Sequence, residues 1–396
     1  MNPSSHSHLS ARVVTDVQAL RPFTERWREL AILDGSPFGT PEWFDAALDA
    51  TPGALPAVVV LTSGDELLGL LPLVRVSRRG VRTLRFPGDA LGDAYPFLLA
   101  HDAPARHCWT AAGRALAALE PGWHAMLLFG ADGDAPWIEH VAVAARCTVH
   151  DRGDLRRPGI DAPEGGWDGL LTGMSRGNRK ETRRILRRIE EREDAELGRS
   201  ETVEDARADM ATLFHLHDLR WGTRGGSSID TDEMRGVLIR FCEAAAGRGW
   251  LRLWTLKLEG GAAASELAWR IGDRQTHYQG GFDPEFSKLG VGIAVFAHAM
   301  RDGLEAGVTR IDLGQGESSY KMRFATDVCV SRRVVLTRTG RPAGLVARSA
   351  LAGRRAAKTW ADANDEAPRD RLKAAVRALR ARPNDTTDES PQSAGE

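Results

Sequence analysis

A glycine-rich segment, GGFDPEFSKLGVGIAVF at residues 280–296, constrains the fold of this chain most strongly. A predicted strand over 274–280 ends in two glycines, and a short loop leads through Gly290 and Gly292 to an apolar stretch, 293–305, that we expect to be helical. Strand, glycine loop and helix in this order commonly hold a pyrophosphate, because free N–H groups at the helix start point toward the anion. Since a glycine pair more often only closes a tight turn, the interpretation also depends on the neighbouring elements.

The elements around the loop favour a binding site in the second half of the chain. Three strands, over 250–257, 262–271 and 274–280, form a predicted meander that leads into the glycine loop. Downstream, 310–313 is predicted to be a buried strand. The segment GQGESSYKMRFA at 314–325 then enters a short helix that carries Tyr320 and Lys321.

Composition narrows the class of protein. A length of 396 residues predicts two or three domains, and 53 basic against 54 acidic residues give no bulk attraction to DNA or to a membrane. The four cysteines are widely spaced, which predicts neither a zinc site nor a disulfide framework. The first residues lack the apolar core of a signal peptide, and no apolar run is long enough to span a bilayer. We therefore expect a cytoplasmic protein, and its oligomeric state stays open.

The order of predicted elements divides the chain. Strand, helix, helix, hairpin, strand, helix and strand recur in similar order in both halves, which indicates an internal duplication and an α/β fold of packed layers. The expected segments are a disordered start at 1–10, a first domain at 11–152, a linker rich in Gly, Pro and Asp at 153–166, a second domain at 167–340, and a helical appendage with a disordered tail at 341–396.

A strongly basic helix is predicted over 175–193 (SRGNRKETRRILRRIEERE). Its acidic residues allow ion pairs one turn apart, so a solvated amphipathic helix is one interpretation. The other is a basic face for a phosphate-bearing ligand, such as the nucleotide end of a cosubstrate or an RNA backbone. Residues 176–184 hold a single acid against five basic residues, and an anion is expected there.

Four stretches of this sequence resemble the GNAT N-acyltransferase superfamily, and more closely its CelD-like branch, which is related to the FemAB aminoacyltransferases. They are PEWF with the following LLPL strand, SRGNRKETRR, GGFDPEFSKLGVG and DLGQGESSYKMRF, and the resemblance covers roughly residues 12–337. It implies an α/β fold of tandem GNAT-like domains. Each would be a mixed, mainly antiparallel sheet flanked by helices, with the site in the second.

The resemblance also implies a donor and the residues that hold it. In the superfamily the glycine loop binds the pyrophosphate of an acyl-CoA, here acetyl-CoA or a longer acyl-CoA. Gly290 and Gly292 match the loop glycines, whereas Ser287 stands where Gln or Arg is usual and Lys288 lies one position late. Since the FemAB relatives use aminoacyl-tRNA, that donor is the alternative. The expected donor-binding residues are Gly281, Lys288, Leu289, Gly290, Val291, Gly292 and Lys321.

Acyl transfer to an amine needs a base, oxyanion stabilisation and a proton for the leaving group. Tyr320 resembles the superfamily's proton donor, and an ordinary tyrosine keeps its proton at neutral pH. Backbone N–H groups of 276–281 are expected to serve the oxyanion. Each side chain also has a packing or ion-pairing role as its alternative. For Glu266, which shares a strand face with Arg270, the alternative is an ion pair between neighbouring strands. The candidate bases are Asp312, Glu317, His277 and Glu266.

No metal site is expected. His215 and His217 are two positions apart on a predicted helix, so they lie on different faces. The predicted function is an N-acyltransferase that moves an acyl group from acyl-CoA to an amine of a small molecule, sugar or peptide. A tRNA-dependent aminoacyltransferase and a non-catalytic GNAT-fold binding module are the alternatives.

Overall fold

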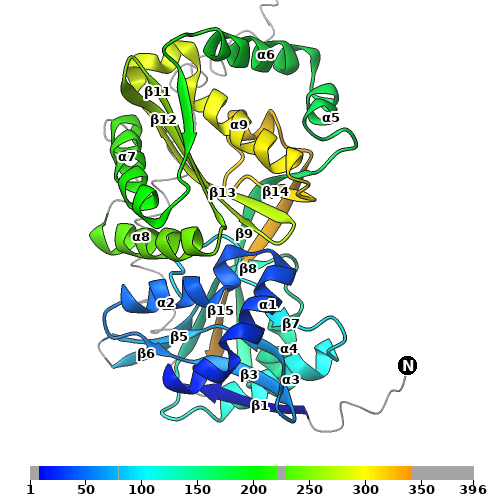
Figure 1. Cartoon of the computed structure of the whole chain (residues 1–396). Helices are drawn as coiled ribbons and strands as arrows, with labels where there is room; N and C mark the ends of the chain where they lie inside the picture. Colours follow the sequence, from blue (N-terminus) through cyan, green and yellow to red (C-terminus); the bar gives the residue numbers. More distant parts are fainter. Residues whose placement is uncertain (1–8, 79, 222–228, 230, 340–396) are drawn as a thin grey trace, which may run out of the picture.

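The computed structural model describes residues 9–78, 80–221, 229 and 231–339 (Figure 1). The predicted appendage and tail at 341–396 lie outside the described residues, as does most of the predicted disordered start. The disorder predicted for residues 9 and 10 is wrong, because strand β1 begins at Leu9 and pairs with β3.

The N-terminal half alternates strands and helices. Its strands are β1 (Leu9–Val14), β2 (Leu55–Pro56), β3 (Val58–Ser63), β4 (Glu66–Leu71), β5 (Val74–Arg78), β6 (Val81–Arg85), β7 (Leu98–Leu99), β8 (Ala125–Asp132) and β9 (Cys147–Asp161). Its helices are η1 (Gln18–Phe23), α1 (Thr24–Asp34), η2 (Pro37–Gly39), α2 (Pro41–Asp49), α3 (Ala105–Ala117) and α4 (Trp137–Ala144).

The C-terminal half repeats this order of elements. After α5 (Gly166–Gly173) and the basic helix α6 (Arg176–Glu190), its helices are α7 (Val203–Trp221), α8 (Asp232–Gly247), η3 (Pro284–Leu289), α9 (Val291–Glu305) and α10 (Ser319–Met322). Its strands are β10 (Glu196–Arg199), β11 (Leu251–Leu258), β12 (Gly261–Ile271), β13 (Arg274–Phe282), β14 (Arg310–Asp312) and β15 (Asp327–Arg338).

Two helix starts follow directly from the sequence. Thr40 caps α2 by accepting a hydrogen bond from Trp43 N at 3.1 Å, and Thr231 caps α8 by accepting one from Met234 N at 3.2 Å. Each hydroxyl satisfies one of the backbone donors that a helix start leaves unpaired. Both predicted N-caps are confirmed.

Among the described residues the strands form two sheets. Four strands pair in the order β1-β3-β4-β7, and eleven in the order β10-β11-β12-β13-β14-β9-β15-β8-β6-β5-β2. Most neighbours are antiparallel, and β13–β14 and β6–β8 are parallel. The fold class of mixed, mainly antiparallel sheets flanked by helices is therefore confirmed.

The predicted linker at 153–166 is wrong over most of its length, because residues 147–161 form the long strand β9. The C-terminal end of β9 pairs with β14, and most of its length pairs with β15, which in turn pairs with β8. The last strand of each half thus pairs with a strand of the other half. A large sheet runs through both halves as a result (Figure 1).

A shared aromatic core also joins the halves. Trp43 of α2 packs edge-on against Phe241 of α8 at a centroid distance of 5.2 Å, and Phe241 contacts Trp269 of β12 at 5.1 Å. All three side chains are buried. The inner face of β12 and β13 is therefore covered by α7, α8 and this core, and their other face is left for α9 (Figure 1).

Candidate functional site

A pocket of about 220 Å³ lies at the start of α9. Its walls come from α7, β12, β13, η3, α9 and α10, all in the C-terminal half. Gly281, Gly290, Val291, Gly292 and Tyr320 line it, so the structure brings together five of the predicted site residues.

The glycine loop leaves the start of α9 open toward this pocket. Gly290 has a φ of 81°, in the left-handed region that glycine adopts without steric cost. No side chain among the described residues caps α9, and its first helical hydrogen bond runs from Ala294 N to Gly290 O at 3.0 Å. The N–H groups before Ala294 consequently have no partner within the helix. A Cβ on Gly292 would lie 3.0 Å from the Phe282 ring, so glycine fits this wall closely.

A β-bulge in β13 sets which side chains face the pocket. The register shifts between Leu267 and Ala268 of β12, and Tyr278 is the extra residue. The bulge puts His277 opposite Ala268, on the same face as Glu266, whereas Tyr278 turns to the core and contacts Trp269 at 4.8 Å. His277 is buried and its Nδ1 lies 2.9 Å from Glu266 Oε1. Glu266 lines the pocket, and His277 lies behind it.

Tyr320 lies across the pocket from β13. Its ring packs edge-on against Phe296 of α9 at 5.3 Å, and the guanidinium carbon of Arg220 lies 5.7 Å from the ring centroid. Arg220, near the end of α7, also donates a hydrogen bond to the carbonyl oxygen of Gly280 at 3.2 Å. Arg220 therefore links Tyr320 to β13 at the wall of the pocket.

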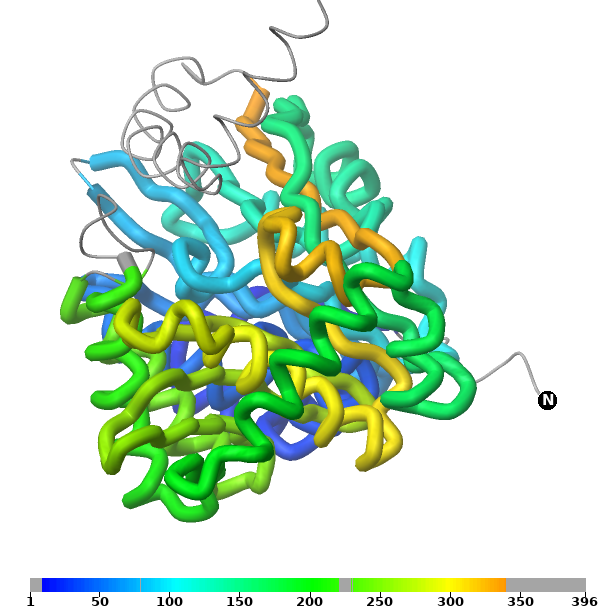
Figure 2. The backbone as a smooth tube through the Cα atoms, turned by 90° about the horizontal axis from the view of Figure 1, so that it is seen from above, coloured from blue at the N-terminus to red at the C-terminus, as the bar shows by residue number. Residues whose placement is uncertain are grey.

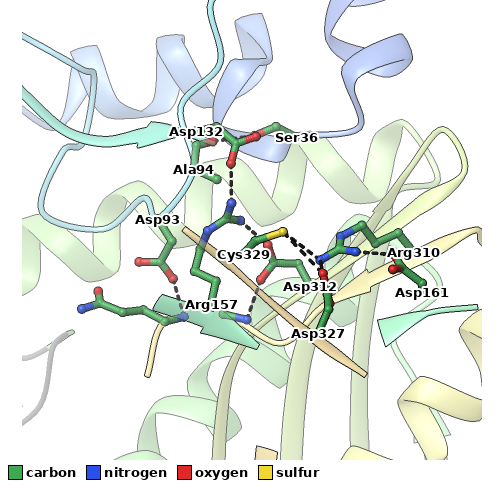
Figure 3. A network of polar contacts seen from close by, with 12 residues as sticks. Ser36, Asp93, Ala94, Asp132, Arg157, Asp161, Arg310, Asp312, Asp327 and Cys329 are labelled. Atoms are coloured by element: carbon green, nitrogen blue, oxygen red, sulfur yellow. Dashed lines mark hydrogen bonds and ion pairs between the residues drawn. The ribbon is translucent and has the colours of Figure 1, made fainter. Parts of the chain in front are cut away.

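Asp312 and Glu317 do not line the pocket. Asp312 pairs with the buried Arg157, which also pairs with Asp132, and Asp312 caps the following turn by accepting from Gly314 N at 2.8 Å (Figure 3). Glu317 pairs with Arg156 at 2.6 Å. Both carboxylates have structural partners where β9 meets the C-terminal half.

The same region contains a further buried carboxyl. Asp93 accepts a hydrogen bond from Gln315 N at 3.0 Å, and burial raises the pKa of Asp93 (Figure 3). Lys321 extends toward this group, since its Nζ donates to the Gln315 carbonyl at 2.7 Å. Lys321 does not line the pocket, in contrast to Tyr320 beside it.

The basic helix α6 holds the glycine loop from outside. It runs beside α9 and η3 (Figure 2), and Ile185 contacts the loop at Gly290. Arg188 Nη1 donates to the carbonyl oxygens of Lys288 at 2.8 Å and Leu289 at 3.4 Å. The side chain of Lys288 is exposed and does not line the pocket. Arg188 therefore holds the glycine loop by donating to the backbone carbonyls of the loop.

Arg188→Ala is expected to weaken pyrophosphate binding at the glycine loop about fivefold, because a partly exposed hydrogen bond to a charged donor contributes about 1 kcal/mol. Isothermal titration calorimetry of both proteins measures the change. Arg184→Ala is the matched control, since Arg184 pairs with Glu181 on the exposed side of the same helix. Equal losses in both variants would mean that α6 acts only through its overall charge.

The pocket also contains residues that the sequence did not identify. Arg220, Phe282 and Phe296 line it, and no local pattern marks them. Glu266 is a candidate base whose partner on the neighbouring strand is His277, while Arg270 pairs with Asp302 of α9. The sequence signal for Glu266 is a carboxylate in the middle of an otherwise apolar strand.

Comparison with known proteins identifies the family. The family model described as "Acetyltransferase (GNAT) domain" matches residues 176–322, which include α6, the glycine loop and Tyr320. Residues 176–322 therefore form a GNAT acetyltransferase domain, which makes the protein an acyltransferase. No curated protein matches the chain in sequence.

Two solved structures share the fold of this chain. The crystal structure of FemX is 12% identical, with a TM-score of 0.56 over 81% of this chain and 96% of FemX. The C-terminal domain (DUF2156) of a putative lysylphosphatidylglycerol synthetase from Agrobacterium fabrum is also 12% identical, with a TM-score of 0.51 over 83% of this chain and 95% of that domain. At this identity the likeness concerns the fold alone.

Two kinds of feature are absent from the described residues. None of their helices is both long and apolar enough to cross a membrane. In the same part of the chain, no three His, Cys, Asp or Glu side chains are grouped so as to hold a metal ion.

Proposed function

We propose that this protein is an N-acyltransferase that moves an acyl group from acyl-CoA to an amine. The observation that carries the proposal is the uncapped start of α9 in the same pocket as Tyr320. The first feature suits the phosphates of the donor, and the second suits its leaving sulfur. We place the whole donor site within residues 167–340.

The loop fits a diphosphate for two reasons. The N–H groups of Val291, Gly292 and Ile293 lie at the positive end of α9, where an anion is stabilised. Gly290 and Gly292 place no side chain between these groups and a ligand. Val291 is buried in the core, so it anchors the loop while its backbone stays available to the phosphates.

Strand β13 offers donors for the thioester carbonyl. Its pairing with β14 ends at Thr276, opposite Asp312, so the edge of β13 beyond this point has no β14 partner. Backbone N–H groups along 277–281 then serve the oxyanion of the tetrahedral intermediate. We propose that the thioester lies along this edge, between the α9 start and Tyr320.

Tyr320 supplies the proton for the leaving thiolate in this reaction. Its phenol lies in the pocket beside Arg220, and its ring is held by Phe296. Asp312 and Glu317 are not placed to take a proton from the amine, because each is held by an arginine outside the pocket.

A second candidate function is aminoacyl transfer from tRNA. The specific observation is the outer face of α6, next to the glycine loop, where basic side chains are exposed to solvent. Such a face fits an RNA backbone. These side chains are Arg176, Lys180, Arg183, Arg184 and Arg187.

Thermal denaturation of the full chain tests the donor. CoA and acetyl-CoA are expected to raise the Tm, since a ligand at one hundred times its Kd stabilises the folded state by about 2.7 kcal/mol. Mass spectrometry with acetyl-CoA and a panel of amines then detects the product. No shift with CoA, but a shift with aminoacyl-tRNA, would replace the first candidate by the second. Binding without any product would favour a non-catalytic module.

A further inference from the structure

A chain of four side chains runs behind the pocket and ends at Glu266. Arg270, Gln275, His277 and Glu266 lie on one face of β12 and β13, because the bulge at Tyr278 restores their alignment. Glu266 is only 7% exposed, and it is the one carboxylate among the described residues that line the pocket.

The hydrogen bonds of Gln275 orient its amide. Its Oε1 lies 3.3 Å from Arg270 Nε and 3.2 Å from Arg270 Nη2, and arginine can only donate. Its Nε2 donates to the carbonyl oxygen of Ala299 at 2.8 Å, and a carbonyl can only accept. The oxygen of the amide therefore faces Arg270, and its NH₂ group faces α9 and His277.

This orientation fixes the tautomer of His277. The NH₂ group of Gln275 lies 3.1 Å from His277 Nε2, so this ring nitrogen must accept and carries no proton. The ring proton is then on Nδ1, which donates to Glu266 Oε1 at 2.9 Å. Glu266 Oε1 is consequently the acceptor at the end of the chain.

The second oxygen of Glu266 faces the pocket. Gly280 lies directly opposite Glu266 in the register, and a Cβ on Gly280 would lie 2.3 Å from Glu266 Oε2. Only a glycine at this position leaves room for the carboxylate. Oε2 has no further hydrogen-bond partner in the described part of the chain, so one oxygen of Glu266 is held and the other is available.

We infer that Glu266 takes the proton from the acceptor amine, and that Arg270, Gln275 and His277 are positioning residues that hold its carboxyl group with Oε2 toward the pocket. This inference rests on the proposed function. The sequence expectation that His277 is itself the base is replaced by this arrangement, because the Nε2 of His277 is occupied by Gln275 and its Nδ1 already carries the proton.

The proton balance is complete. The acceptor enters as an ammonium ion and gives one proton to Glu266 Oε2, which later releases it to solvent. The freed lone pair of nitrogen forms the C–N bond with the acyl carbon. As the C–S bond breaks, sulfur takes the proton of Tyr320, and the second proton lost by nitrogen restores the phenol through solvent. The products are an amide, CoA thiol and one released proton.

Other titratable side chains around Glu266 come from three helices. Arg220 and His217 lie on α7, Tyr320 on α10, and Asp302, paired with Arg270, on α9. Burial lowers the pKa of His217 to about 4, so this ring is neutral where the enzyme works. If replacing Glu266 changes the acid limb of the pH–rate profile, His217 is therefore not the group that causes the change.

Two variants test the role of Glu266. Glu266→Gln keeps an oxygen that can accept from His277 Nδ1, so the Tm and CoA affinity are expected to stay unchanged. Its rate of acyl transfer should fall about tenfold or more at neutral pH, and its pH–rate profile should lose the acid limb. Gly280→Ala keeps Glu266 but displaces its carboxylate, and should lower the rate in the same way without weakening CoA binding.

The tautomer of His277 can be tested without measuring enzyme activity. Nitrogen-15 NMR of the histidine rings is expected to show a proton on Nδ1 of His277, assigned by its loss in His277→Asn. In His277→Asn the amide can still donate to Glu266, so this variant should retain part of the activity. In His277→Leu no donor remains, so its activity should be lower still and its acid limb should move to higher pH. An Nε2–H tautomer would overturn the chain.

The outcomes separate this inference from the proposed function. If the wild type transfers acyl groups from acyl-CoA and Glu266→Gln keeps both its rate and its acid limb, only the role of Glu266 is wrong. If the wild type binds no CoA and acylates no amine, the proposed function fails and the role of Glu266 fails with it, whatever the tautomer of His277.

Discussion

Gly290→Asp is expected to remove CoA binding while the fold stays intact. Gly290 is the N-cap of α9, and an aspartate there accepts hydrogen bonds from the first N–H groups of the helix. The new carboxylate would occupy the donors that we assign to the phosphates and would repel them by its charge. We expect CoA affinity to fall about 100-fold or more, which corresponds to about 2.7 kcal/mol.

Two control variants separate charge from shape at this position. Gly290→Asn also tolerates a positive φ and also caps a helix, but it is neutral, so its loss of affinity should be smaller. Gly290→Ala adds only a Cβ, which would lie 3.2 Å from Ile185, and tests crowding by itself. Calorimetry with CoA and the Tm of each variant measure the effects. Wild-type affinity in Gly290→Asp would show that the phosphates bind elsewhere.

Local sequence patterns predicted the elements that build the site. Hydroxyl N-caps at Thr40 and Thr231, the three-stranded meander and the strand–loop–helix at Gly290 all depend on neighbours a few residues apart. The glycine loop is therefore visible in the sequence, and the structure places its glycines at the pocket.

Long-range pairing was not visible in the sequence. Residues 153–161 are rich in Gly, Asp and Pro, which is typical of a linker, yet they form a strand because β14 and β15 pair with both of its edges. Those partners lie about 150 residues or more downstream, so no local pattern announces them. The domain boundary placed at this linker stays a prediction.

The bulge at Tyr278 explains why the side chains that we propose for proton transfer were harder to assign. Without it, His277 would lie opposite Trp269 and face the core, away from Glu266. Strict alternation along β13 cannot reveal such a shift. The same applies to Asp312, whose position after a buried strand suggested a functional carboxylate, although the structure places the buried Arg157 beside it.

Tyr320→Phe is expected to lower turnover about 100-fold while CoA affinity stays unchanged. General acid catalysis of this kind contributes at least about 100-fold, and phenylalanine cannot protonate the leaving thiolate. The ring contacts of Tyr320 with Phe296 and Arg220 do not involve the hydroxyl, so the Tm should hold. Steady-state kinetics with acetyl-CoA and calorimetry with CoA measure the two effects.

The leaving group provides the control for this prediction. An acyl donor whose leaving group needs no proton, such as an activated aryl thioester, should be used by Tyr320→Phe nearly as fast as by the wild type. Rescue by such a donor would assign the hydroxyl to protonation of sulfur and not to binding. An equal loss with both donors would mean that Tyr320 positions the acyl group. An unchanged turnover with acetyl-CoA would mean that Tyr320 has no role in the reaction.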